Sequence, residues 1–196
     1  MAYFMVTDIT HLLDEEGFPV DGPAGRLARY LGTIISSASV APVGMWIDAA
    51  IRCRRRPNRQ PCRGHIRLRR TGLSSPVDWG CTWCDEGGVI SNWQRSIWDL
   101  SVAGVESGAI NGPPLEVVLA IEELNAVRQN LIFDLEIERV LASARKTAQG
   151  CLMRATEEDL DNLLEYIASE ANHEGNRRRV RLLNQAYYQV ELALRS

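Results

Sequence analysis

The sequence predicts an α+β protein with a helical N-terminal segment, short cysteine-bearing β hairpins in the centre, and a mostly helical C-terminal domain with two short strands. Three observations predict this class. Apolar residues recur at helical spacing near both ends of the chain, apolar and basic residues alternate in the centre, and four of the five cysteines lie between residues 53 and 84. With 196 residues, 45% of them hydrophobic, the chain can bury a core.

Residues 1–45 are predicted to form a small helical cap. The stretch PAGRLARYLGTIISSA places apolar side chains on one face at helical spacing, and Pro23 suits the first turn of that helix. A short helix or turn around Thr7–Leu13 is expected before it. Pro42 and Gly44 are expected to end the segment.

Residues 46–100 form the cysteine region, where the period of the pattern changes. HIRLRRTG alternates apolar and basic residues and is predicted to be a strand, and VDWGC and GVISNWQ are predicted to be two more, separated by TWCDEGG. Trp79 and Trp93 are expected to fill the core of these strands. Three short strands bury little apolar surface, so this region needs an additional source of stability.

Residues 101–113 are small and glycine-rich and predict a linker, and residues 114–196 predict a mainly helical domain. PLEVVLAIEELNAVRQ and CLMRATEEDLDNLLEYIASEA each predict a strand followed by a helix. FDLEIERVLASARKTAQ predicts a helix that ends at Gly150, and NRRRVRLLNQAYYQVELAL predicts the last helix. Thr156 and Asn176 are the expected N-caps.

The two strand-to-helix stretches, VVLAIEEL and CLMRATEEDL, resemble each other. A β-α-α duplication with paired strands would explain the likeness. The alternative explanation is that any helix start favours acidic residues in its first turn.

The overall composition restricts the class of protein. No apolar run reaches the roughly 18 residues of a membrane span, and the N-terminus lacks the basic region of a secretory signal, so a cytoplasmic location is expected. The five cysteines are an odd number in a chain without such a signal. A disulfide framework is therefore disfavoured, and metal binding is the better interpretation.

The spacing of the cysteines predicts a structural zinc site. Cys81 and Cys84 form a C-x2-C pair, which lets two thiolates bind one ion from a tight turn, and such a site needs two more ligands. Cys62 lies at the spacing expected between zinc-ribbon pairs, and the fourth ligand is either Cys53 or His65. We favour Cys53, because an unligated thiol among arginines would be acidic and easily oxidised, whereas His65 begins a strand on which it could face solvent. The predicted ligands of a structural Zn²⁺ are therefore Cys53, Cys62, Cys81 and Cys84, with His65 as the alternative to Cys53.

Paired ligands on hairpins, with DWGCTWC entering the turn and GVISNW leaving it, resemble the zinc-ribbon class over residues 51–93. The resemblance implies a structural ion rather than a catalytic one. The whole sequence also resembles a family of uncharacterised proteins that share an arginine-rich first half and a continuation like DEGGVISNWQ. That second resemblance implies no activity.

Nine arginines and no acidic residue occupy the segment from Arg52 to Arg70, although the whole chain has a net charge of -3. Such a segment can neutralise phosphates, and nearby tryptophans could stack on bases, so nucleic acid is one expected partner. Alternatively, the arginines pair with acidic residues of the same chain, of a protein partner or of a second copy. The predicted polyanion-binding residues are Arg54, Arg55, Arg56, Arg59, Arg63, Arg67, Arg69 and Arg70.

A second basic run opens the last helix and contains Arg177, Arg178, Arg179 and Arg181. Positive charge at a helix N-terminus opposes the helix dipole, so this run favours acidic neighbours, such as Glu170 and Glu174, or an anionic partner.

Three functional hypotheses follow. The first is a zinc-stabilised, non-enzymatic binding protein with a regulatory or nucleic-acid-associated role. The alternative is a protein–protein adaptor whose arginines are paired internally. A zinc-dependent hydrolase is the third; it would use Asp85 or Glu86 beside the ion, or His173 and Glu174, which we interpret first as a polar junction between helices.

Overall fold

The computed structural model describes residues 3–101, 115–129 and 135–195, and the chain divides into two compact units, Met1–Gly104 and Val105–Ser196. Helices and strands occur in both units, so the α+β class is confirmed. Except for Ser101, the predicted linker lies outside the described residues. The separate folding of the four predicted segments stays a prediction that limited proteolysis would check.

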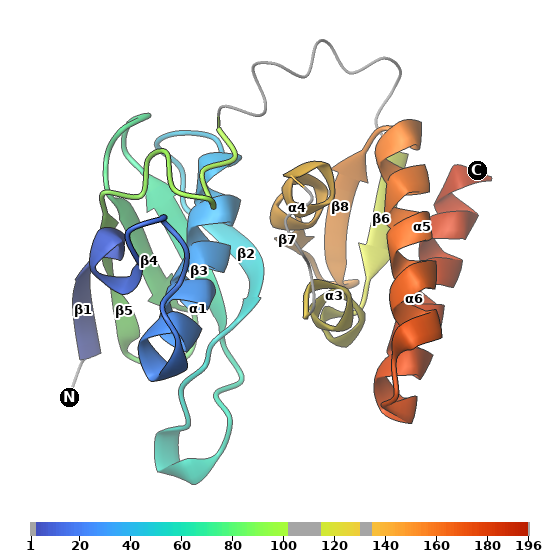
Figure 1. The fold of residues 1–196 in the computed structure, drawn as a ribbon, viewed down its shortest axis with the longest axis horizontal. Coiled ribbons are helices and arrows are strands. Elements are labelled where there is room, and N and C mark those ends of the chain that lie inside the picture. Colours follow the sequence, from blue (N-terminus) through green and yellow to red (C-terminus); the bar gives the residue numbers. More distant parts are fainter. Residues whose placement is uncertain (1–2, 102–114, 130–134, 196) are drawn as a thin grey trace. The chain divides into compact units, whose positions relative to one another are not determined.

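A mixed β-sheet forms the framework of the first unit, with the strand order β1-β5-β4-β3-β2 (Figure 1). β1 and β5 are parallel, and the other neighbours in this sheet are antiparallel. The strands span β1 (Tyr3–Asp8), β2 (Ile47–Arg52), β3 (His65–Arg70), β4 (Val77–Cys81) and β5 (Glu86–Ser91). The three strands predicted from the alternating pattern are therefore confirmed as β3, β4 and β5, whereas β1 and β2 were not predicted.

One helix, α1 (Gly22–Ser39), covers one face of this sheet (Figure 1) and follows the short 3-10 helix η1 (Ile9–Leu12). Both helices agree with the predicted positions. The core between helix and sheet includes the following residues: Leu31, Ile34, Ile35, Ile66, Leu68 and Trp79. Residues predicted as a cap and residues of the cysteine region thus share one core.

Three tryptophans show how tightly this core is packed. Trp79 and Trp93 are 3% and 0% exposed, as predicted. Trp98 packs against α1 so closely that a Cβ added at Gly32 would lie 2.2 Å from the ring carbon Cε2. A side chain at position 32 would therefore displace the tryptophan.

The second unit contains a smaller antiparallel sheet in which β8 pairs with both β6 and β7. Its elements span β6 (Leu115–Leu119), α3 (Ile121–Arg128), α4 (Leu135–Ala142), β7 (Arg145–Lys146), β8 (Cys151–Ala155), α5 (Glu157–His173) and α6 (Arg177–Leu194). α5 and α6 lie side by side, and α6 also packs on α3 and β6. α4 ends earlier than predicted, because the chain pairs as β7 with β8 before it reaches Gly150.

The expected N-caps are confirmed. The Thr156 hydroxyl accepts a hydrogen bond from the Asp159 amide at 3.1 Å, and the Asn176 side chain accepts from the Arg178 amide at 3.0 Å. β6 and β8 pair directly, as a duplication would require, with Val117 opposite Met153. The duplication itself stays a hypothesis.

Within the described residues, no helix combines the length and the apolar character needed to cross a bilayer.

Candidate metal centre

Four cysteine sulfurs come together where two loops of the first unit meet. Cys53 and Cys62 lie on the loop between β2 and β3, and Cys81 and Cys84 lie at the turn between β4 and β5. The four Sγ atoms all lie within 4.8 Å of one another. Cys53 Sγ lies 3.7 Å from Cys84 Sγ, and Cys62 Sγ lies 3.7 Å from Cys81 Sγ, so each contact joins one loop to the other. An ion bound by the cluster would therefore join the two loops.

Backbone amides point at two of the sulfurs. The Gly64 N–H donates to Cys62 Sγ at 3.3 Å, and the N–H groups of Trp83 and Cys84 donate to Cys81 Sγ at 3.3 and 3.5 Å. Hydrogen bonds from N–H groups stabilise the thiolate form, which is the form that binds a metal. Each of the two loops thus offers at least one backbone N–H group to one cluster sulfur.

Backbone hydrogen bonds also close the base of the loop beside the cluster. The Cys53 N–H donates to the Gly64 carbonyl at 3.0 Å, and the Cys62 N–H donates to the Arg55 carbonyl at 2.8 Å. The base of the loop is therefore a closed, hydrogen-bonded segment. Since Cys53 and Cys62 stand at its two ends, any ion that binds both of them also closes the loop.

His65, the predicted alternative to Cys53, begins β3 and is half-buried. Its backbone N–H donates to the Thr82 hydroxyl at 3.0 Å. Among the described residues, the side chains that gather within ligand distance of one another are the four cysteines, without His65.

An ion pair between a buried glutamate and an exposed arginine lies directly behind the cluster. The Glu86 carboxylate is 3% exposed; its Oε2 lies 3.2 Å from Cys53 Sγ, and its Oε1 lies 3.4 Å from Arg54 Nε. The Arg54 guanidinium in turn lies 5.1 Å above the centre of the Tyr30 ring. Glu86, one of the two acids considered for a zinc-dependent hydrolase, thus contacts an arginine and a thiol. Asp85, the other, is exposed.

Burial is the main cause that raises the pKa of the Cys53 thiol in this environment, and the hydrogen bond to Glu86 adds to it. Burial also raises the pKa of Tyr30, and the Glu86 charge adds to that effect. A bound divalent cation reverses this balance for a thiol, because a coordinating thiol is deprotonated outright. The Cys53 position therefore favours either a neutral thiol or a thiolate bound to a metal.

The second candidate, His173 with Glu174, lies in the other unit at the junction of α5 and α6. The His173 ring Nδ1 lies 2.8 Å from the Ser169 carbonyl oxygen within its own helix. The amide of Asn176, together with the Arg179 guanidinium, lowers the pKa of Glu174. These contacts fit the polar junction between helices that the sequence suggested.

Some residues around the cluster were not singled out by sequence reasoning. Tyr30 has no sequence signal, because it reaches the site from α1 through the tertiary fold. For Gly64 the sequence did offer a signal, because this glycine lies between two predicted metal ligands, Cys62 and His65. A Cβ at Gly64 would lie 2.3 Å from Cys81 Sγ and 2.7 Å from Trp83 Cβ.

Replacing Gly64 by alanine is expected to weaken metal binding about 10–100-fold, the usual effect of disturbing groups that orient metal ligands. The added methyl would force Cys81 or the Trp83 backbone to move. Affinity is measured by competition with a chromophoric chelator. Gly72→Ala is the matched control, because its Cβ would meet nothing closer than Ser75 Oγ at 3.7 Å. Equal affinities of the two variants would contradict this role of Gly64.

Comparison of the chain with protein-family models, curated proteins and solved structures found no match, so neither the zinc-ribbon class nor the uncharacterised family is confirmed. The arrangement that the structure establishes is a cluster of four cysteines able to hold a metal ion.

Proposed function

We propose that the chain is a zinc-stabilised, non-enzymatic binding protein whose arginine-rich loop contacts the phosphate backbone of nucleic acid. One observation carries this proposal: two of the four clustered sulfurs belong to the loop that carries the arginines, with Cys53 and Cys62 at its base. The ion would hold the loop in one shape, and the exposed arginines on that loop would meet the partner.

Zinc is the metal that suits this donor set best. Four cysteine thiolates in a tetrahedron are a common ligand set for structural zinc, and they leave no open coordination position for a substrate or water. A catalytic zinc normally keeps such a position. Since Cys53, Cys62, Cys81 and Cys84 would complete the shell, we assign the ion a structural role. Thiolate ligands also suit the reducing environment of the cytoplasm, where we expect the protein to act.

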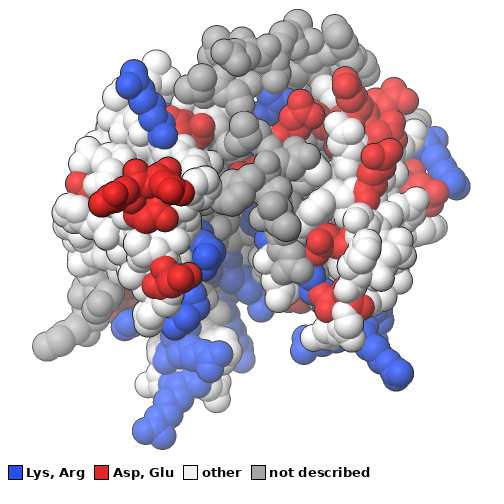
Figure 2. Space-filling view, viewed as in Figure 1, with Lys and Arg blue, Asp and Glu red and all other residues white. Residues whose placement is uncertain are grey.

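The tip of the loop carries several exposed basic side chains. Figure 2 shows basic side chains gathered on a projection, which Figure 1 draws as the loop between β2 and β3. The loop contains the short 3-10 helix η2 (Pro57–Arg59), and Asn58 and Arg59 have positive φ values of 53° and 64°. The arginines that are exposed on this loop are Arg54, Arg55, Arg56, Arg59 and Arg63.

The remaining arginines of the predicted set differ in how they are held. The guanidinium carbons of Arg67 and Arg69 lie 5.2 and 4.9 Å from the centre of the Trp46 ring. Trp46 itself is 45% exposed. Arg70 is only 3% exposed, and it donates to the carbonyls of Ser39 and Ala41. We therefore leave Arg70 out of the proposed surface and assign it a structural role.

Two ion pairs favour the second candidate function, a protein–protein adaptor with internally paired arginines. Arg54 pairs with Glu86, and Arg69 pairs with Asp78 at 2.9 Å. Such ion pairs within the chain neutralise part of the positive charge of the arginine-rich segment. Arg56, Arg59 and Arg63 form no ion pair with an acidic side chain among the residues that the structure describes, and they decide between the two functions.

The deciding experiment measures binding to a duplex oligonucleotide over a range of salt concentrations. The double variant Arg56→Gln with Arg63→Gln is expected to lower the slope of log K against log salt by about 1.8, since each lost duplex phosphate contact removes about 0.9. The matched control is Arg26→Gln with Arg29→Gln, which removes the same charge from exposed positions on α1.

An unchanged slope in the control supports contact at the loop. If both double variants lower the slope equally, only net charge matters and the loop has no special role. If the unmodified protein is not retained on nucleic acid even at low salt, the adaptor function is the better conclusion.

A further inference from the structure

The arginine run at the start of α6 is divided by the fold into one inward-facing residue and three outward-facing residues. Arg179 is 5% exposed and turns into the unit, where its Nε and Nη2 each donate to the Ala126 carbonyl at 3.1 Å. It also contacts Glu170 and Glu174, the acidic partners that the sequence suggested. The other three arginines, Arg177, Arg178 and Arg181, are exposed.

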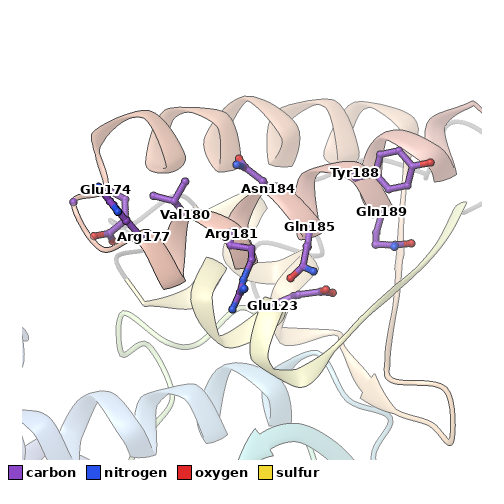
Figure 3. Close-up of a pocket in the computed structure, with 10 residues that line it drawn as sticks. Glu123, Glu174, Arg177, Val180, Arg181, Asn184, Gln185, Tyr188 and Gln189 are labelled. Carbon is purple, nitrogen blue, oxygen red and sulfur yellow. The ribbon is translucent and has the colours of Figure 1, made fainter.

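A groove of about 640 Å³ runs along the outward-facing side of α6, next to α3. Figure 3 shows Arg181, Gln185 and Glu123 around the middle of this groove, with Arg177 toward one end and Tyr188 toward the other. Positions 177, 181, 184, 185 and 188 follow each other at steps that keep them on one face of a helix. The opposite face, with Arg179, Leu183, Ala186 and Val190, is buried against the rest of the unit.

The exposed face offers several side chains that can hydrogen-bond to a nucleic acid. It combines arginines with the amides of Asn184 and Gln185 and with Tyr188, which is 59% exposed. Arginine, asparagine and glutamine are the side chains that form bidentate hydrogen bonds with guanine and adenine edges. Positive charge at the N-terminus of α6 also opposes the helix dipole, a local cost that an anionic partner would offset.

The dimensions of α6 suit the same partner. An α-helix with its side chains is about 10–12 Å across, and the major groove of B-DNA is about 12 Å wide. The 18 residues of α6 would extend for about 27 Å at about 1.5 Å per residue. One face of the helix is buried and the other is exposed along most of its length, so a partner can contact the exposed face while the unit's core stays intact.

We propose that the exposed face of α6 is a second nucleic-acid-binding surface, which enters the major groove of double-stranded DNA. Arg177 and Arg181 bind phosphates and guanine edges, and Asn184 and Gln185 read base edges. This surface lies in the other unit, so it goes beyond the proposed function and does not depend on the metal or on the arginine-rich loop. Two surfaces on one chain would together bind the same duplex more tightly than either alone, provided that both can reach it.

Two acidic residues line the same groove, and their negative charge affects how strongly the surface binds an anion. Glu174 pairs with Arg179, but Arg179 also pairs with Glu170, so this group keeps a net negative charge at one end of the groove. Glu123 accepts a hydrogen bond from the Ala120 amide at 2.8 Å, an interaction that glutamine can also make. Its negative charge opposes phosphate binding beside Arg181, so Glu123→Gln is expected to increase duplex affinity.

The test compares full-length variants in duplex binding at several salt concentrations. Arg177→Gln with Arg181→Gln is expected to lower the salt slope by about 1.8, at about 0.9 per duplex phosphate contact. The matched control, Arg154→Gln with Arg195→Gln, removes the same charge from arginines of the same unit that lie outside the groove. Far-UV circular dichroism confirms that each variant is folded.

A second measurement distinguishes base reading from phosphate binding. Asn184→Ala with Gln185→Ala is expected to change which sequences are selected from a pool of random duplexes, while the salt slope stays constant. An unchanged preference, or a slope that drops equally in the control pair, would overturn the proposal. A loss of single-stranded RNA or DNA binding without loss of duplex binding would also overturn it, because the surface would then serve another partner.

The loop variant Arg56→Gln with Arg63→Gln is measured in parallel. If the loop variant binds like the unmodified protein and the α6 variant does not, the proposed function of the loop fails and the α6 surface stands. The reverse pattern rejects the α6 surface alone.

Discussion

Removing the metal from the purified protein is expected to lower the melting temperature of the first unit by roughly 15–30 °C. A ligand present at about 1,000 times its dissociation constant stabilises the folded state by about 4 kcal/mol. In a domain of this size, each kcal/mol corresponds to about 4–8 °C. The effect is large because Cys53, Cys62, Cys81 and Cys84 join two separate loops, and without an ion their sulfurs no longer hold those loops together.

The measurement can be made specific to each unit. All five tryptophans, Trp46, Trp79, Trp83, Trp93 and Trp98, lie in the first unit. Tryptophan fluorescence therefore follows the first unit alone. Hydrogen exchange is expected to show early loss of protection at the amides of Gly64, Trp83 and Cys84, which donate to sulfur, while α5 and α6 keep theirs.

The fifth cysteine provides the matched control. Cys151 lies in β8 of the second unit and is 1% exposed. Cys151→Ala is expected to keep one zinc ion per chain by elemental analysis, whereas Cys84→Ala is expected to lose it. A fluorescence transition that a strong chelator leaves unchanged, in protein shown to contain zinc beforehand, would contradict a structural metal.

Local patterns predicted the elements whose partners are near in sequence. The alternation in HIRLRRTG is sufficient for β3, since its inward residues Ile66 and Leu68 meet the core directly. β1 was missed because it pairs in parallel with β5, more than 80 residues later, and its exposed Phe4 and Val6 give no sign of a buried face. β2 was missed because IDAAIR has consecutive alanines in place of the β-branched and aromatic residues typical of strands.

The same distinction applies to the metal cluster. The C-x2-C spacing of Cys81 and Cys84 is a local signal, and it predicted where a pair of sulfurs would lie. The approach of Cys53 to Cys84 depends on the pairing of β2 with β3 and of β4 with β5, which the cysteine spacing only suggested. The layer behind the sulfurs, with Glu86 and Tyr30, could not be predicted, because it exists only once α1 has packed on the sheet.

The second large effect is expected at Arg179, the inward-facing member of the α6 run. Arg179→Met is expected to lower the free energy of unfolding of the second unit by about 3 kcal/mol, the lower end of the about 3–5 kcal/mol typical for breaking a buried ion pair. The Arg179 side chain is 6% exposed, but the carboxylates of Glu170 and Glu174 keep 21% and 16% exposure, so water compensates part of the loss. Urea unfolding followed by far-UV circular dichroism measures the change, and Arg178→Met, at the neighbouring exposed position, should shift stability by less than about 0.5 kcal/mol.

The pH dependence of this effect follows from Glu174. The Asn176 amide and the Arg179 guanidinium lower the pKa of Glu174 in the folded protein, so the stability from its ionised form is present above the ordinary glutamate pKa. That stability is lost as the pH falls through the lowered value. The difference between the unmodified protein and Arg179→Met should therefore shrink in acid, and a difference that stays constant down to low pH would contradict the role of the Glu174 carboxylate.

Arg179→Lys separates charge from geometry at the same position. The arginine fork contacts the Ala126 carbonyl and both carboxylates at once. A lysine ammonium is a compact point charge on a flexible stem, and it cannot reproduce a planar fork. We therefore expect Arg179→Lys to recover less than half of the stability lost in Arg179→Met. Full recovery would mean that a positive charge alone holds α6 against α3 and α5, and that the fork geometry adds nothing.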